Sequence, residues 1–315
     1  MVFKIVYHQT SQIFESLELK YPNQIPYIYA IVSSLFVALS SLIVKFCKEI
    51  PAYEQVYFRS IILIFITNKL MGISGEKAQC QDKKAFKYLI WRSIFSAGSN
   101  ICFFTSSQMI NLAESNIIFL TSPIWSNILG YFFFEEKILL VNILYTIISF
   151  ISIVFLLKPP FLTSEIQQNQ PFDLKYLLGQ IIGFGGAISY AINCHLNKHL
   201  KGSVSIQQLV FYLCSSVLIC CSIIKVVQAY STSQAFELKY IGFYIILALL
   251  QLVIQIFINQ ALFMKGANKI VPFNYFQVLF SFGFDYFLFE KPLDIIQTIS
   301  TLVIIFCCYK IAVKT

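Results

Sequence analysis

Amide side chains recur at helical spacing in two apolar stretches of the chain, and they are the residues best suited to bind a solute. Gln251, Gln255 and Asn259 follow one another every four residues. A second polar stripe consists of Asn274, Gln277, Ser281 and Asp285. Residues three or four apart share one face of a helix. Lipid tails cannot satisfy an amide, so each stripe must face a neighbouring helix or a wet cavity, and the amide-rich stripes favour a cavity.

Two further apolar stretches carry polar stripes of mixed character. Their members are Ser93, Ser96, Asn100 and Ser107 in the first and Gly179, Gly183, Gly186, Tyr190 and Asn193 in the second. For these hydroxyls and glycines the alternative is interhelical hydrogen bonding and close helix packing.

The candidate solute-binding residues come from all of these stretches and from the apolar segment 114–134. They are Asn100, Ser122, Trp125, Tyr190, Asn193, Gln251, Gln255, Asn274 and Gln277, with Trp125 expected to stack or to gate. Amides and hydroxyls both donate and accept hydrogen bonds, which suits a neutral or zwitterionic solute of low net charge.

Charged residues are rare within the apolar stretches, and we expect every Lys and Arg to lie near a membrane surface. Arg59 falls roughly 9 Å inside its helix by the rise per residue, where it can snorkel and take a structural or gating role. Asp285 is a candidate carrier of a coupling proton, the alternative being an interfacial carboxylate paired with Lys291. The pairs Glu136–Lys137 and Glu290–Lys291 are expected to lock helix ends.

A multiply anionic solute would need fixed cations in the cavity, because an unpaired anion is very costly at low dielectric. Citrate-like acids therefore remain an alternative only if Lys45, Lys198 or Arg59 turns inward.

Signals for catalysis and for metal binding are weak. His195 and His199 stand four apart, as metal ligands can, but only Cys194 lies beside them, so we expect no metal. Nine cysteines form no CxxC pair and mostly lie in apolar runs, where they read as packing residues. Neither a nucleophile–base pair nor a HExxH element is found, so we expect no enzyme activity and no cofactor.

The elements that position these residues are membrane helices. Of 315 residues, 57% are hydrophobic and 12% charged, and the mean hydropathy is +0.72, which does not suit a water-facing surface. The net charge of +8 is spread over loops and helix ends, so nucleic acid is not an expected partner. We predict helices at 26–46, 53–73, 87–109, 114–134, 138–157, 174–196, 206–228, 239–263, 270–289 and 293–312.

The chain contains an internal sequence repeat. Ala113–Lys137 returns 154 residues later as Ala267–Lys291, with Phe119/Phe273, Glu136/Glu290 and Lys137/Lys291 among the matches. Each half holds five predicted helices, so the second must enter the membrane from the opposite face, as in transporters with inverted repeats. The predicted fold is an all-α membrane protein of ten transmembrane helices in two inverted five-helix repeats. Its parts are an N-terminal tail 1–25, repeats 26–158 and 174–312, a linker 159–173 and a C-terminus 313–315.

Pro123 interrupts the hydrogen bonding of the segment Ala113–Lys137 near its middle. A proline there removes one backbone bond and kinks the helix, so Thr121, Ser122 or a neighbouring helix must satisfy the freed carbonyl. We expect Pro123 to serve mobility.

The distribution of Lys and Arg predicts the orientation. With the N-terminus in the cytoplasm, the basic loop Gly75–Lys84 and the cluster Lys198–Lys201 face inward, and we count Arg92 with that loop. Cytoplasmic loops carry an excess of positive charge, so both termini are expected in the cytoplasm, in either the plasma membrane or an endomembrane.

Four segments resemble one family: PAYEQVYFRS (51–60), LAESNIIFLTSPIWSNILGYFFFEEK (112–137), LLKPPF (156–161) and VPFNYFQVLFSFGFDYFLFEK (271–291). The chain resembles the drug/metabolite transporter superfamily with EamA-type repeats, and within it the solute carrier 35 proteins of subgroup G. The resemblance implies ten helices in two inverted repeats, cytoplasmic termini and a central cavity lined by helices 1, 3, 4, 6, 8 and 9.

The function expected from these features is secondary transport of a small polar solute by alternating access within the lipid bilayer. The alternative is a membrane scaffold or regulatory protein that keeps a transporter fold without transport.

Overall fold

Helices are the regular elements of the residues that the structure, a computed structural model, describes. These residues are 16, 18–46, 52–77, 79–80, 82–110, 112–134, 140–157, 174–228, 240–289 and 295–313. In chain order the helices are α2 (Ile25–Phe46), α3 (Ala52–Ser74), α4 (Lys83–Met109), α5 (Leu112–Phe119), α6 (Ser122–Phe132), α7 (Leu140–Leu157), α8 (Leu174–Leu196), η1 (Asn197–Leu200), α9 (Ile206–Gln228), α10 (Ile241–Met264), α11 (Ala267–Ile270), η3 (Val271–Tyr275), α12 (Phe276–Phe289) and α13 (Ile295–Val313). Each of the ten predicted ranges coincides with helical residues.

Six of the described helices are long and apolar enough to cross a membrane, namely α2, α3, α8, α9, α10 and α13. The others fall short for identifiable reasons. Lys83, Lys84, Lys87 and Arg92 make the first part of α4 polar, and α7 is a shorter apolar helix. Two further segments are divided by prolines into shorter pieces.

The prolines break the helices in which they stand. Pro123 lies in the first turn of α6 and Pro272 in the first turn of η3. A proline is tolerated in a first turn, because the N–H that it lacks would have no intrahelical partner there. The prediction of one continuous helix over 114–134 is therefore wrong, since Leu120 and Thr121 form a turn between α5 and α6. The predicted range 270–289 is helical throughout, but residues 271–275 form the 3-10 helix η3. At the turn before Pro123, Ile118 O accepts hydrogen bonds from the Thr121 hydroxyl at 2.6 Å and from the Thr121 N–H at 3.1 Å.

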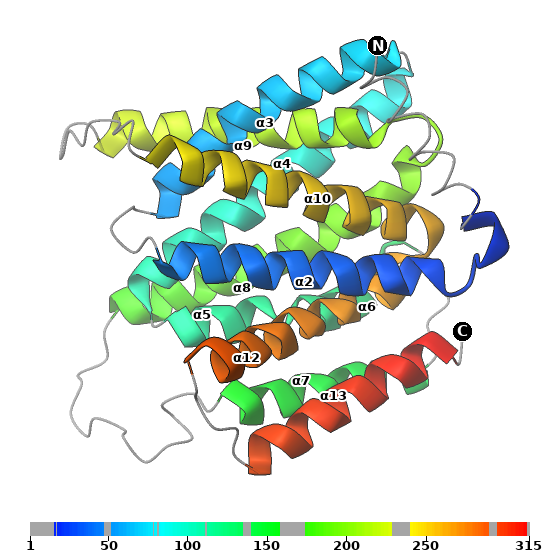
Figure 1. The fold of residues 1–315 in the computed structure, drawn as a ribbon, viewed down its shortest axis with the longest axis vertical. Coiled ribbons are helices and arrows are strands. Elements are labelled where there is room, and N and C mark those ends of the chain that lie inside the picture. The colour runs from blue at the N-terminus through cyan, green and yellow to red at the C-terminus, as the bar shows by residue number, and fades with distance from the viewer. Residues whose placement is uncertain are drawn as a thin grey trace.

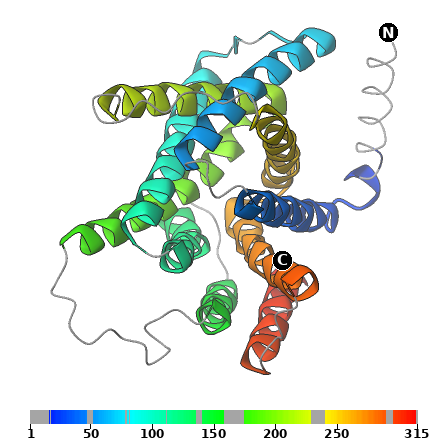
Figure 2. The same cartoon turned by 60° about the vertical axis from the view of Figure 1, so that its left-hand side comes forward.

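The most extensive helix packing joins the first part of the chain to the second. The pairs are α4 with α8, α2 with α10, α3 with α9 and α7 with α13. Figures 1 and 2 show α3 crossing α9, and Figure 1 shows α2 next to α10 and α7 next to α13. The two parts are therefore interleaved.

Glycines set the distance between α4 and α8. An added Cβ at Gly179 would lie 2.7 Å from Ile110 Cγ2, and one at Gly183 would lie 2.8 Å from Ser106 Oγ. At Gly186 the nearest atom would be Cys102 Cβ, at 3.0 Å. For these three positions the close-packing alternative is correct, since they face a neighbouring helix.

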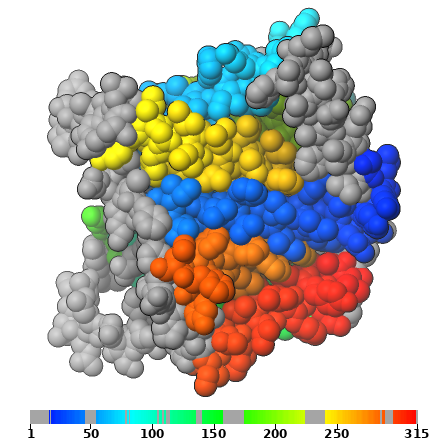
Figure 3. Space-filling model, viewed as in Figure 1, coloured from blue at the N-terminus to red at the C-terminus, as the bar shows by residue number. Residues whose placement is uncertain are grey.

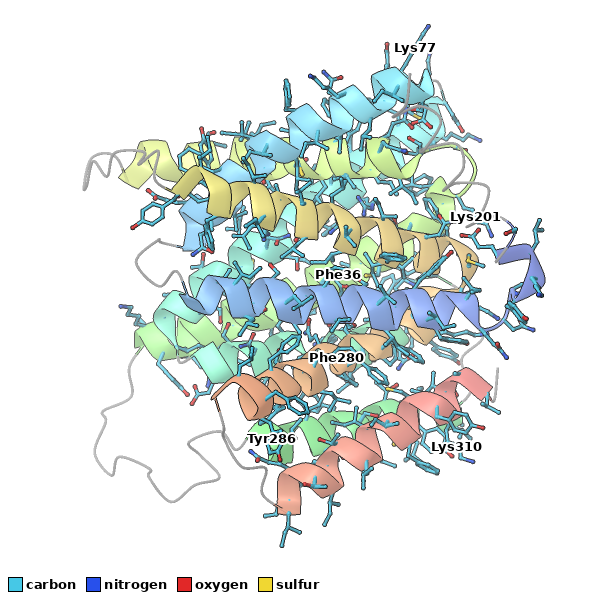
Figure 4. All side chains as sticks on the ribbon, in the orientation of Figure 1. Phe36, Lys77, Lys201, Phe280, Tyr286 and Lys310 are labelled. Carbon is cyan, nitrogen blue, oxygen red and sulfur yellow. The ribbon has the colours of Figure 1, made fainter. Side chains whose placement is uncertain are left out.

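The helices run between two chemically different ends. Figure 4 places Lys77, Lys201 and Lys310 at one end, here called the lysine-rich end, and Tyr286 toward the other. The start of α2 and the end of α13 lie at the lysine-rich end as well (Figure 1). The first and last described helices thus begin and finish on the same side.

Apolar side chains cover much of the outside of the bundle. Leu140, Phe287, Phe133 and Phe132 are 82%, 79%, 75% and 70% exposed. On the face seen in Figure 3, α10, α2 and α12 lie against one another in one layer. Large exposed apolar residues in such number suit contact with lipid.

Candidate functional site

Arg92 is the largest fully buried side chain among the described residues, with 1% of its surface exposed. It lies roughly 13 Å inside α4 by the rise per residue. Its Nε donates to Asn197 Oδ1 over 2.9 Å, its Nη2 to Asn259 Oδ1 over 2.8 Å and its Nη1 to Leu209 O over 3.3 Å. One guanidinium thus joins α4 to η1, α9 and α10.

The grouping of Arg92 with the basic loop Gly75–Lys84 is wrong, because its side chain is buried among α4, η1, α9 and α10. Arg92 follows two turns of α4, and its side chain faces the interior of the bundle. Three amide and carbonyl oxygens replace water around the charge, which makes its burial tolerable. The signal was present in the sequence, since Arg92 lies inside the predicted helix 87–109.

Two chains of amides lead away from Arg92. Asn259 Nδ2 donates to the Gln255 carbonyl over 2.7 Å and to Gln255 Oε1 over 3.0 Å. Asn197 Nδ2 donates to the Asn193 carbonyl over 3.3 Å. Two predicted site residues, Gln255 and Asn193, are therefore parts of one network. Arg92, Asn197 and Asn259 were missing from the predicted site, although Asn259 belongs to the predicted stripe.

Tyr190 and Asn274 form a second polar contact nearby. Asn274 Nδ2 donates to the Tyr190 hydroxyl over 3.0 Å, joining η3 to α8. The Tyr190 ring lies 5.4 Å from that of Phe119, at the end of α5. Tyr190 lies on α8, which packs along its length against α4, the helix that carries Arg92.

Serines of α2 connect the same elements. The Ser33 hydroxyl donates to Ile254 O of α10 over 3.2 Å, and the Ser34 hydroxyl donates to Phe273 O of η3 over 3.0 Å. Both serines are buried. These two hydrogen bonds join α2 to α10 and to η3. The sequence does not distinguish them, because a serine pair in an apolar helix is a common packing feature.

Other predicted residues bond within their own helical segments. Asn100 Nδ2 donates to Ser96 O over 2.8 Å, and Trp125 Nε1 donates to Thr121 Oγ1 over 3.1 Å. Ser122 is buried in the first turn of α6. Gln251 and Gln277 are half-buried, and Arg59 is half-buried in α3.

Several predicted residues lie outside the described structure. Glu136, Lys137, Glu290 and Lys291 belong to undescribed segments, as does the linker 159–173. Asp285 belongs to α12 and Lys45 to α2, but their side chains are not described. The helix-end locks and the proton carrier therefore stay predictions.

His195, at the end of α8, and His199, in η1, stack on aromatic rings. Phe134 lies 4.7 Å from the His195 ring, and Tyr88 lies 4.6 Å from the His199 ring. His195 Nε2 is 2.8 Å from Ser126 O, which can only accept, so this nitrogen carries a proton and donates. Within the described residues, no group of three or more His, Cys, Asp or Glu side chains could hold a metal ion.

Polar contacts hold both ends of the bundle. At the lysine-rich end, Glu18 Oε1 accepts hydrogen bonds from the Tyr29 hydroxyl at 3.2 Å and from Gln260 Nε2 at 2.8 Å. At the other end, the Tyr176 hydroxyl of α8 donates to Glu114 Oε2 of α5. Neither contact was predicted, and the Glu18–Gln260 and Glu114–Tyr176 bonds join residues 242 and 62 positions apart.

Comparison with known proteins gives a consistent result. The model of the EamA-like transporter family matches residues 24–158 and again residues 177–313. Solute carrier family 35 member G1 of Mus musculus is 24% identical over 276 residues, covering 84% of this chain and 71% of that protein. The Homo sapiens protein of the same name is 23% identical over 276 residues, covering 84% and 72%. One crystal structure has the same fold, with a TM-score of 0.73 at 11% identity, covering 93% of this chain and 97% of that one.

Proposed function

Because the chain belongs to the EamA-like transporter family and is an integral membrane protein, we propose that it is a secondary transporter. It moves a small polar metabolite of low net charge by alternating access through a site between two inverted five-helix repeats. The solute contacts Tyr190, Asn193, Gln255 and Asn274, with Asn100, Ser122, Trp125, Gln251 and Gln277 around them.

The helix pairing supports the inverted repeat. A two-fold axis that exchanges α2 with α8 and α4 with α10 turns the α4–α8 contact into the α10–α2 contact, and both are extensive. The same axis exchanges α3 with α9 and α7 with α13, so that each of these two contacts is symmetric about the axis. Transporters with inverted repeats place their solute site near the midplane, where the repeats meet. The two repeats that we propose are residues 26–158 and residues 174–312.

The observation that carries the proposal is the buried polar network. Arg92 of the first repeat bonds to Asn259 of the second, which bonds to Gln255, and the Tyr190–Asn274 contact lies within the second repeat. Polar groups buried within membrane helices are costly and mark solute or ion pathways. Four of the nine predicted binding residues belong to this region.

The chemistry of the network supports a solute of low net charge. Amide and carbonyl oxygens surround Arg92, the one cation with less than 2% of its surface exposed among the described residues. One charge cannot balance the several negative charges of a nucleotide sugar. A zwitterion or a monoanion fits it better.

The positions of the lysines support cytoplasmic termini. The lysine-rich end holds the start of α2 and the end of α13, and positive loops stay in the cytoplasm. We therefore place the lysine-rich end in the cytoplasm and the linker 159–173 on the opposite side.

Counterflow in proteoliposomes tests the proposal. The purified full-length chain is screened with radiolabelled amino acids, monocarboxylates and nucleotide sugars, together with Gln255→Leu, Asn274→Leu and the lipid-facing control Tyr131→Phe. We expect flux of one low-charge class, reduced at least about tenfold by both site variants. A flux that both variants leave unchanged contradicts the site. Absence of any flux from folded protein contradicts transport and favours the scaffold alternative.

A further inference from the structure

The direction of the hydrogen bonds around Arg92 determines which atoms of Gln255 are left for a solute. A guanidinium only donates, so the side-chain atom of Asn259 that lies 2.8 Å from Nη2 must be the oxygen. The other atom of this amide is then the nitrogen, which carries two N–H groups. They point at the carbonyl and at Oε1 of Gln255.

The same reasoning extends one residue further. Gln255 Oε1 accepts from Asn259 at 3.0 Å, so it is turned toward Asn259. The oxygen and nitrogen of a planar amide point in different directions, so Gln255 Nε2 is turned away from Asn259. Gln255 is half-buried, and no residue in the described ranges accepts a hydrogen bond from Nε2. Its two N–H groups are available in the interior of the bundle.

An amide alone could rotate to present either its oxygen or its nitrogen. Rotation of the Asn259 amide is unfavourable, because it would place the two N–H groups of Asn259 against the Arg92 guanidinium. The cost would be a broken charge-assisted hydrogen bond and two facing donors at low dielectric. Arg92 therefore sets the polarity of the whole chain of amides.

We propose that Arg92 is a positioning residue that fixes the Gln255 amide as a hydrogen-bond donor, so that the solute is held there through an acceptor oxygen, and best through a carboxylate. The inference rests on the solute site proposed above. N–H groups bind a charged oxygen more strongly than a neutral one. The buried positive charge of Arg92 adds to this preference, because its field is weakly screened inside the bundle.

The charge and the hydrogen-bond direction can be separated by substitution. Gln255→Met removes the two donors and leaves Arg92 and Asn259 in place. Asn259→Asp keeps the shape and still accepts from Arg92, but it cannot donate to Gln255. The Gln255 amide must then rotate, donate to the new carboxylate and present its oxygen to the solute.

Binding of three matched probes tests the inference directly. Propionate, propionamide and propylammonium are titrated against the full-length chain in phosphatidylcholine nanodiscs, and the shift of the unfolding midpoint is measured. Wild type is expected to bind propionate at least about tenfold more tightly than the other two. Arg92→Lys should retain part of this preference, since lysine also only donates.

The variants give the decisive outcomes. In Gln255→Met the preference for propionate should fall at least about tenfold, and in Asn259→Asp propylammonium should become the tightest probe. The exposed control Asn68→Asp makes the same chemical change in α3 and should bind as wild type does. Equal binding of the three probes by wild type, no binding of any, or an unchanged order in Asn259→Asp would each overturn the inference.

These outcomes are distinct from those of the transport assay. Carboxylate binding without flux would leave this inference standing and contradict transport. Flux of a solute that lacks any acceptor oxygen would support transport and contradict this inference.

Discussion

The Tyr190 hydroxyl accepts a hydrogen bond of 3.0 Å from the Asn274 amide, and these residues lie 84 positions apart in the chain. The contact joins α8 to η3, just after Pro272 in the broken segment. Both residues belong to the proposed second repeat, 174–312.

Tyr190→Phe should therefore impair function more than stability. Loss of one neutral hydrogen bond costs about 1 kcal/mol of unfolding free energy. We expect a small decrease in the unfolding midpoint and at least about a tenfold decrease in counterflow. Tyr131→Phe removes a hydroxyl from the lipid-facing surface and should change neither. Equal flux in the two variants would remove Tyr190 from the solute site.

Gly179→Ala should destabilise the bundle, because its new Cβ would meet Ile110 and Met109 at 2.7 and 2.8 Å. Overpacking of this kind typically costs about 1–3 kcal/mol. Gly185→Ala is the matched control in the same helix, since nothing lies within 4 Å of the added carbon. Thermal unfolding in nanodiscs measures both, and equal midpoints would contradict the close approach of α4 and α8.

Asn193→Leu should stabilise the fold and reduce transport. Asn193 is buried, and its Oδ1 has no hydrogen-bond partner among the described residues. An unsatisfied buried acceptor costs about 1–3 kcal/mol, which leucine would recover in part. A raised unfolding midpoint with lower counterflow would identify Asn193 as a residue kept for binding. A lowered midpoint would show that its role is structural.

Pro123→Ala should insert and fold normally while exchange between inward and outward states slows. Alanine is accommodated in the first turn of α6 without strain, but it restores an N–H that can bond back across the break between α5 and α6. The measurement is the rate of counterflow at equal protein content. An unchanged rate would exclude the break from the mechanism.

Single cysteines test the orientation of the bundle. Ser203→Cys lies at the exposed lysine-rich end and Lys175→Cys at the exposed opposite end. In intact cells, an impermeant maleimide should label the second site when the protein is in the plasma membrane, and the first only after permeabilisation. The reverse pattern would invert the proposed topology.

Much of the fold follows from hydrophobic runs that the sequence displays directly. Helical residues occur at every predicted range, because an apolar run of that length has few alternatives in a membrane. The turn at Thr121 and the 3-10 helix that begins at Val271 were not predicted. A proline indicates where a helix is weak, but its neighbours decide whether the helix bends or stops.

The site was less predictable than the fold. Helical spacing identified Gln255, Tyr190 and Asn274, because amides and phenols in apolar helices are conspicuous. It did not identify Arg92 as an interior residue, since whether an arginine near a helix end faces water or the interior depends on the partner helices. Asn197 and Leu209, which bind it, lie more than a hundred residues away.

The glycine contacts between α4 and α8 have a mechanical consequence. Because an added Cβ at Gly179, Gly183 or Gly186 would collide with α4, the two helices are packed too closely to slide past one another. We therefore expect α4 and α8 to move as one rigid pair, which takes one helix from each half of the chain. In the proposed transport cycle, the bending is expected within each half, before α6 and before α12.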